Sequence, residues 1–203
     1  MDFKLTIFSD YICPWCYVGQ GVVEKLSAEY NVEVDWRPYY LNPNTPPEGM
    51  ELPDYIIRAR ANGSEERLAM MAEKHGMPFK STERIYNTRL AHEATEYARE
   101  HSKLNEFHRV VFRKVYAEGY DISKWDVLRA AAEEVGLNGA DMQQAVESGK
   151  YTREVADQVQ WAQRIGVTGV PTYVINDKYA VVGAQPYEVF KNALSQILDA
   201  KIA

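Results

Sequence analysis

The sequence is poor in cysteine, histidine and positive charge. Its 203 residues include 2 cysteines and 4 histidines, and 23 basic side chains against 29 acidic ones give a net charge of −6. This acidic balance, with no basic run, argues against binding to nucleic acid or to an anionic membrane surface. A single CxxC pair without a histidine pair at ligand spacing argues against a zinc site. We therefore expect no metal, no nucleic-acid partner and no membrane partner.

Long apolar runs are also missing. No segment approaches the length of a transmembrane helix. The first residues, Met1-Asp2-Phe3-Lys4, lack the positive region and long apolar stretch of a secretory signal. These absences predict a cytoplasmic protein. In that reducing compartment a lone CxxC pair is more often catalytic than structural.

Both cysteines lie in Cys13-Pro14-Trp15-Cys16, between an apolar strand-like run and a predicted helix. On a helix this separation leaves the Cα atoms about 5–6 Å apart, which suits a disulfide. We expect Cys13 at the helix N-terminus, where free N–H groups and the helix dipole favour a thiolate. Pro14 suits the first helical turn. The pattern predicts a redox-active dithiol in which Cys13 attacks and the less exposed Cys16, with a higher pKa, resolves the mixed disulfide.

Hydrophobic periodicity predicts the order of the elements. Strands at 3–8 and 32–37 flank a helix at 18–30, which makes a parallel β-α-β unit. Glycine, proline and polar residues then separate a series of predicted helices at 52–61, 65–75, 88–101, 104–118, 124–135, 140–148 and 151–165. After them, strands at 172–175 and 179–182 form a predicted hairpin, and a last helix is predicted at 186–200. This order predicts an α/β thioredoxin-like fold (β-α-β … β-β-α) with a large all-helical insertion. The predicted thioredoxin-like domain comprises residues 1–44 and 166–203, and the predicted helical insertion domain comprises residues 45–165.

A proline precedes the returning strand, in Gly169-Val170-Pro171-Thr172. In a tight turn such an X-Pro bond can be cis. A cis Val170–Pro171 bond would place an apolar ring against the sulfurs. It would also leave the Val170 backbone free to pair with an extended substrate.

Four segments resemble one family in the same order along the chain. They are 8–19 with the CPWC motif, 36–43 (Trp-Arg-Pro-Tyr-Tyr-Leu-Asn-Pro), 87–92 (Asn-Thr-Arg-Leu-Ala-His) and 169–176 with Pro171. Together they resemble the FrnE-like branch of the DsbA family of thiol–disulfide oxidoreductases. The resemblance implies a thioredoxin fold with a helical insertion, exchange chemistry at Cys13 and Cys16, and a cis proline at Pro171.

The same superfamily includes the 2-hydroxychromene-2-carboxylate isomerases and the kappa-class glutathione transferases. Those enzymes have serine at the position of Cys13, where it holds the glutathione thiolate. They usually carry a Ser-Asp pair before the last helix, and here that place reads Ala184-Gln185. Both departures argue against a transferase, and glutathione remains a possible co-substrate.

Several other residues have two interpretations each. Asp10 is either a strand-end residue or a proton acceptor for Cys16, and Trp15 either shields the dithiol or tunes its potential. We expect the four histidines at helix surfaces or ends, with His92 as the one candidate for a role at the site, because its segment resembles the family. Five tyrosines predict either an aromatic substrate groove or core packing: Tyr11, Tyr17, Tyr39, Tyr40 and Tyr86.

The sequence therefore predicts a thiol–disulfide oxidoreductase, acting as reductase, isomerase or oxidase on protein or small-molecule disulfides. It would have no tightly bound cofactor beyond the Cys13–Cys16 disulfide. Its partners would be disulfide- or thiol-containing proteins, and glutathione stays open as a further partner. Two alternatives remain open: a glutathione-dependent isomerase or transferase, and a non-catalytic binder of unfolded chains.

Overall fold

A four-stranded mixed sheet forms the centre of the fold. The computed structural model describes residues 3–202, with side chains described as far as Leu198. The strands are β1 (Phe3–Ser9), β2 (Val32–Pro38), β5 (Thr172–Ile175) and β6 (Tyr179–Val182), in the order β2-β1-β5-β6. β1 runs parallel to β2 and antiparallel to β5, and β5 pairs antiparallel with β6. The predicted parallel unit and the predicted hairpin are both confirmed.

Helices cover both faces of this sheet. On one face, α1 (Pro14–Glu29) and α9 (Tyr187–Ile202) bury Leu26 and Phe190 against the inward side chains of β1 and β5. On the other face, Phe8 packs against α8 (Thr152–Arg164) through Ala162 and Trp161. Because strand side chains alternate between faces, Ile7 and Phe8 belong to the two different layers. The thioredoxin-like fold is confirmed.

The predicted helices of the insertion are present with their ends shifted by at most two residues. They are α2 (Asp54–Ala61), α3 (Ser64–Lys74), α4 (Arg89–Glu100), α5 (Leu104–Tyr116), α6 (Trp125–Glu134), α7 (Gly139–Glu147) and α8. A small antiparallel pair, β3 (Met50–Glu51) with β4 (Arg84–Ile85), joins them. Its strands are too short for a period-2 pattern, so the sequence does not predict them. Among residues 3–202, none of the helices combines the length and apolar character needed to cross a bilayer.

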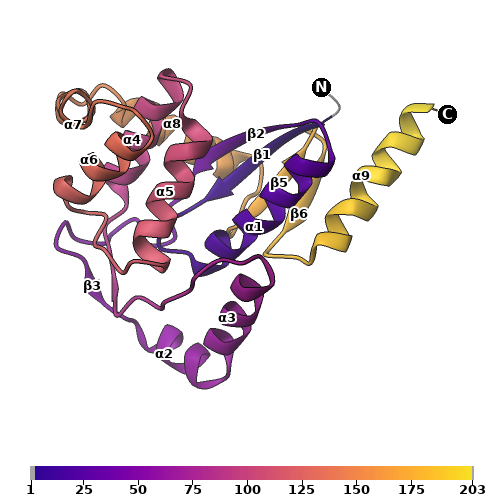
Figure 1. Cartoon of the computed structure of the whole chain (residues 1–203), viewed down its shortest axis with the longest axis horizontal. Helices are drawn as coiled ribbons and strands as arrows, with labels where there is room; N and C mark the ends of the chain where they lie inside the picture. Colours follow the sequence, from indigo (N-terminus) through magenta and orange to yellow (C-terminus); the bar gives the residue numbers. More distant parts are fainter. Residues whose placement is uncertain (1–2, 203) are drawn as a thin grey trace.

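The start of α1 joins the sheet to the helical part. Figure 1 shows α1 between the insertion helices on one side and α9 on the other. The buried side chains of Cys13, Cys16, Tyr17 and Val18 belong to the same hydrophobic core as α4, α5 and α6. The dithiol therefore lies where two cores meet. The division of the chain at 44/45 and 165/166 stays a prediction.

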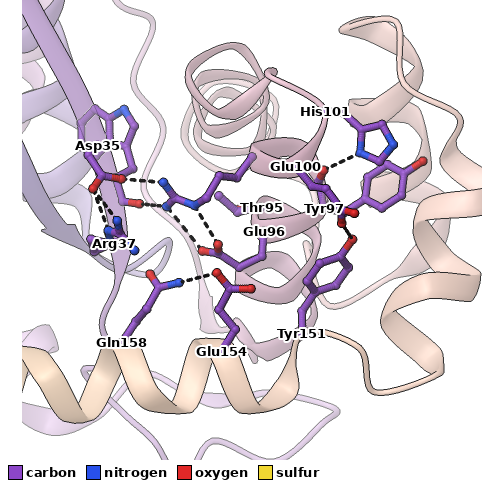
Figure 2. A network of polar contacts seen from close by, with 12 residues as sticks. Asp35, Arg37, Thr95, Glu96, Tyr97, Glu100, His101, Tyr151, Glu154 and Gln158 are labelled. Atoms are coloured by element: carbon purple, nitrogen blue, oxygen red, sulfur yellow. Dashed lines mark hydrogen bonds and ion pairs between the residues drawn. The ribbon is translucent and has the colours of Figure 1, made fainter.

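An ion-pair network fixes α4 against β2. Arg99 of α4 reaches Asp35 at 2.5 Å and Glu96 at 2.7 Å, and it also donates to the Trp36 carbonyl (Figure 2). Arg37 adds a second contact to Asp35 at 2.6 Å. The Glu96 side chain is 1% exposed, so its charge depends on Arg99 for compensation. This anchor holds the rest of α4, including His92, beside the sheet.

Candidate active site

The two cysteines stand at the N-terminus of α1. Cys13 is the N-cap residue, and its N–H donates to the Asp10 carbonyl at 2.9 Å. Its own carbonyl accepts hydrogen bonds from Cys16 N at 3.0 Å and Tyr17 N at 3.3 Å, which closes the first turn. Pro14 occupies the start of the helix, where its missing N–H is not needed. The helix begins four residues earlier than its apolar periodicity predicts, because the CPWC residues themselves form its first turn.

The two thiols differ in their surroundings. Cys16 is 1% exposed, and burial, followed by its hydrogen bond with Cys13, raises the pKa of the Cys16 thiol well above its ordinary value. Cys16 is also the less exposed of the two thiols, as predicted. Cys13 is only 3% exposed, which is more buried than the sequence predicts for an attacking group. It nevertheless lines a surface cavity, whereas Cys16 does not.

The Val170–Pro171 segment lies directly against Cys13. The Val170–Pro171 peptide bond is cis, and the Cys13 Sγ donates to the Val170 carbonyl at 3.5 Å. No backbone–backbone hydrogen bond within residues 3–202 uses the N–H or the carbonyl of Val170. The Val170 N–H therefore remains available to an extended chain that lies beside Cys13, and the carbonyl becomes available when the Cys13 thiol gives up its proton.

A cavity of about 250 Å³ adjoins Cys13. Pro14 and Trp15 line it beside Cys13, and residues of the insertion close it: Leu52, Tyr55, Ile56, Ala59, Arg60, Ser64, Glu65, Leu68, Ser81, Thr82, Ile85 and Tyr116, with Ile12, Leu41 and Asn42 at its edge. The lining is mostly apolar. Sequence reasoning missed the contribution of Leu52 and of Ile56 in α2, although both are apolar and their spacing of four residues suits one face of the predicted helix 52–61.

Of the two interpretations of the five tyrosines, core packing holds for Tyr11 and Tyr17. None of the five tyrosines lines this cavity. Tyr11 is 1% exposed, and its hydroxyl pairs with Thr95 at 2.6 Å. Tyr17 is also buried, and its hydroxyl donates to the Pro78 carbonyl at 2.6 Å. Helices of the insertion pack over both rings, so these two residues belong to the core; Tyr39, Tyr40 and Tyr86 are half-buried elsewhere.

Asp10 and His92 meet inside the protein. Asp10 is fully buried at the end of β1, and its Oδ2 accepts from the Leu41 N–H at 2.8 Å. Its Oδ1 lies 3.4 Å from His92 Nε2. Burial is the main cause of the raised pKa of Cys16; a hydrogen bond with the Asp10 backbone lowers this pKa, and the negative charge of the Asp10 carboxylate raises it.

The sequence predicts all four histidines at helix surfaces or ends, but two of them are buried. His92 is 4% exposed, and His108 is 3% exposed and stacks on Trp36 with ring centroids 3.9 Å apart. Burial, followed by the charge of His92, lowers the pKa of His108 well below its ordinary value. Both imidazoles lie on the faces of α4 and α5 that turn toward the sheet. His75 is half-buried and His101 is exposed near their helix ends.

The sheet order, the CPWC turn at the start of α1 and the adjacent Pro171 define a thioredoxin-fold protein with a vicinal dithiol. Within the described part of the chain, no group of three or more His, Cys, Asp or Glu side chains is arranged to hold a metal ion. Residues 4–195 match the model of the DSBA-like thioredoxin domain. The chain therefore belongs to the DsbA-like thioredoxin family.

Known proteins resemble the chain over nearly its whole length. YwbO of Bacillus subtilis, an uncharacterized protein, is 32% identical over 96% of this chain and 97% of its own. The crystal structure of a probable DsbA oxidoreductase, SCO1869 from Streptomyces coelicolor, has a TM-score of 0.87 at 28% identity and covers 96% of this chain and 89% of its own. A 2-hydroxychromene-2-carboxylate isomerase shares the fold, with a TM-score of 0.82 at 18% identity over 98% and 99% of the two chains.

Proposed function

We propose that this protein is a thiol–disulfide oxidoreductase in which Cys13 exchanges with substrate and Cys16 resolves. The observation that carries the proposal is the contact set of Cys13: its carbonyl accepts from the Cys16 N–H at 3.0 Å, its Sγ lies 3.5 Å from the Val170 carbonyl oxygen, and the residue lines the cavity. One thiol thus has access to a substrate sulfur, and the other is held behind it.

Reduction of a substrate disulfide takes two exchanges. The Cys13 thiolate attacks one substrate sulfur, so that a Cys13–substrate disulfide forms and the second substrate sulfur leaves as a thiolate. The Cys16 thiolate then attacks the Cys13 sulfur, which forms the Cys13–Cys16 disulfide and releases the first substrate sulfur. Two electrons pass from the dithiol to the substrate. Two molecules of an external monothiol of the glutathione type restore the dithiol by the reverse exchanges and leave joined as their own disulfide.

The second exchange requires a proton acceptor. Because burial raises the pKa of Cys16, this thiol is protonated near neutral pH and is a poor nucleophile until it loses its proton. Asp10 is the acceptor in this scheme, since its charge acts on Cys16. His92, at 3.4 Å from Asp10 Oδ1, is a positioning residue that holds the carboxylate in place.

Substrate binding divides between two surfaces. The N–H of Val170, which makes no backbone–backbone hydrogen bond within residues 3–202, favours an extended polypeptide beside Cys13. The apolar cavity behind Pro14 and Trp15 favours an uncharged group attached to the reacting sulfur. Trp15 is half-buried at this cavity, so it shields the dithiol from water. We propose disulfide-containing proteins and small disulfides as substrates, with glutathione as a possible co-substrate.

Trapping tests this function directly. In Cys16→Ser, the mixed disulfide at Cys13 cannot be resolved, so a reaction with a disulfide-containing peptide accumulates a covalent adduct that mass spectrometry places on Cys13. Cys13→Ser is the matched control and forms no adduct. A Cys16→Ser protein that stays unmodified contradicts the proposal. A glutathione-dependent isomerase would instead keep its turnover after Cys16→Ser.

A further inference from the structure

One buried hydroxyl group beside the dithiol has no partner. Tyr116 ends α5, is 1% exposed, and lines the same cavity as Cys13. Its ring stacks with those of Tyr17 and Phe79 at centroid distances of 5.2 and 6.1 Å. The hydroxyl oxygen is shielded from water and makes no hydrogen bond within residues 3–202.

A buried unpaired hydroxyl is unusual because it loses its hydrogen bonds to water and gains nothing in exchange. Phenylalanine would fill the same stack without this cost. Tyr17 provides the contrast, because it lies in the same stack and its hydroxyl is satisfied by the Pro78 carbonyl. The hydroxyl of Tyr116 is therefore a group that packing does not explain, at the wall of a cavity that also exposes Cys13.

Tyr116 lines the same cavity as Cys13 and belongs to the same hydrophobic core as both cysteines. Burial is the main cause that raises the pKa of Tyr116 well above its ordinary value, and the charges of Cys13, Cys16 and Asp10 follow in that order. A phenol in this environment keeps its proton throughout the pH range in which thiolates form. It is therefore a hydrogen-bond donor to negative charge and not a base.

We propose that the Tyr116 O–H donates a hydrogen bond to the substrate sulfur that leaves when Cys13 attacks, and that the apolar group on that sulfur occupies the cavity. This inference rests on the proposed thiol–disulfide exchange. In the step, the bond between Cys13 and the first substrate sulfur forms as the substrate disulfide breaks. The electron pair of the broken bond stays on the leaving sulfur, which faces the phenol, and solvent protonates it after release.

The cavity walls specify the class of the leaving group. Leu52, Ile56 and Leu68 present hydrocarbon to it. Arg60 also lines it, although its guanidinium already donates to the Thr82 carbonyl at 2.7 Å. An uncharged alkyl or aryl thiol matches these walls better than an anionic one. Tyr116 would supply the polar contact at the sulfur end.

Two disulfides with different leaving groups separate this role from a packing role. Dipropyl disulfide releases an alkyl thiolate whose charge stays on sulfur, whereas 4,4′-dithiodipyridine releases a thiolate whose charge spreads into the ring and needs less help. We expect Tyr116→Phe to slow the first exchange of dipropyl disulfide with Cys13 by about tenfold, the usual effect of a lost hydrogen bond to a charged group. The rate with 4,4′-dithiodipyridine is expected to change by less than about twofold.

Tyr17→Phe is the matched control because it removes a hydroxyl from the same stack outside the cavity. We expect it to lower the melting temperature, since its bond to Pro78 is lost, and to leave the rates with both disulfides unchanged. Tyr116→Phe should melt no lower than the wild type, because its hydroxyl has no bond to lose.

Each other result has a distinct meaning. Equal slowing with both disulfides, or no slowing with either, overturns the role of Tyr116 while the exchange function stands. If the unaltered protein reacts with neither disulfide, the proposed function itself fails, and this inference fails with it.

Discussion

Gly19 of α1 lies so close to Tyr173 of β5 that a Cβ at position 19 would be 2.3 Å from the Tyr173 hydroxyl oxygen. The same Cβ would lie 3.6 Å from the Pro171 ring. Absence of a side chain at this position therefore lets the first turns of α1 pack directly on the strand that follows the cis peptide bond. The spacing between the dithiol and Pro171 depends on this contact.

Substitution Gly19→Ala should destabilise the protein by about 1–3 kcal/mol, the usual cost of overpacking a dense core. Urea unfolding measures this change. Gly169→Ala is the control near the same site, because a Cβ there would meet nothing within 4 Å. Equal stability of Gly19→Ala and the wild type would contradict the close packing of α1 on β5.

Replacement Asp10→Asn should slow the resolving step and spare the first attack by Cys13. Loss of a positioned base typically costs about 10²–10⁴-fold in rate. The step is measured by loading Cys13 with a chromophoric thiol as a mixed disulfide and following its release by Cys16. Because the pKa of Cys16 is raised, the difference from the wild type should narrow at alkaline pH, where hydroxide ionises the thiol. A constant rate ratio across pH would contradict a role for Asp10 as proton acceptor.

Removal of Arg99 should leave the buried carboxylate of Glu96 without its positively charged partner. Arg99→Met is expected to destabilise the protein by about 3 kcal/mol, since breaking a buried ion pair leaves an uncompensated charge. Arg153→Met is a suitable control, because that side chain is 94% exposed and its ion pair among the described residues is with the exposed Asp157 at 3.7 Å. Its loss should change the free energy of unfolding by less than about 0.5 kcal/mol. Similar effects for both variants would show that the network in Figure 2 is not a stabilising anchor.

Glu154 should make stability fall as pH rises. Burial and then the negative charge of Glu96 raise the pKa of Glu154 in the folded protein above its ordinary value of 4.5. The folded state therefore holds the proton of Glu154 more tightly than the unfolded state. The stability that this proton contributes is complete below about pH 4.5 and is lost as the pH rises through the pKa of the folded state. Glu154→Gln should be more stable than the wild type at pH 7 by a few tenths of a kcal/mol, because solvent screens this exposed group. Thermal melts of both proteins at pH 4 and pH 7 measure the sign of this stability difference. A Glu154→Gln variant that is less stable than the wild type at pH 7 contradicts the prediction.

Much of the fold could be predicted because its signals are local. The turn at Asn176 and Asp177, both at positive φ, separates two apolar strands, and polar turn residues between such runs predict a hairpin. The apolar spacing of Val22, Val23 and Leu26 likewise predicts α1 as a helix packed on the sheet. Such patterns reflect the burial of one face and need no knowledge of distant contacts.

The parts that were missed depend on contacts between distant segments. His108 is buried because Trp36 of β2 stacks on it, and nothing near either residue in the sequence indicates this pairing. The cavity beside Cys13 likewise combines Leu52, Tyr116 and Trp15, which belong to three separate helices or their flanks. Periodicity identifies the apolar face of each helix but not the neighbour that the face meets.

A redox titration of the purified protein tests the dithiol most directly. After equilibration in buffers of graded reduced and oxidised glutathione, acid quenching and alkylation of free thiols, mass spectrometry counts the modified cysteines. The proposed chemistry predicts one reversible two-electron transition in which Cys13 and Cys16 lose and regain reactivity together, and in Cys16→Ser a glutathione adduct on Cys13 instead. Two cysteines that stay alkylated at every ratio would contradict it.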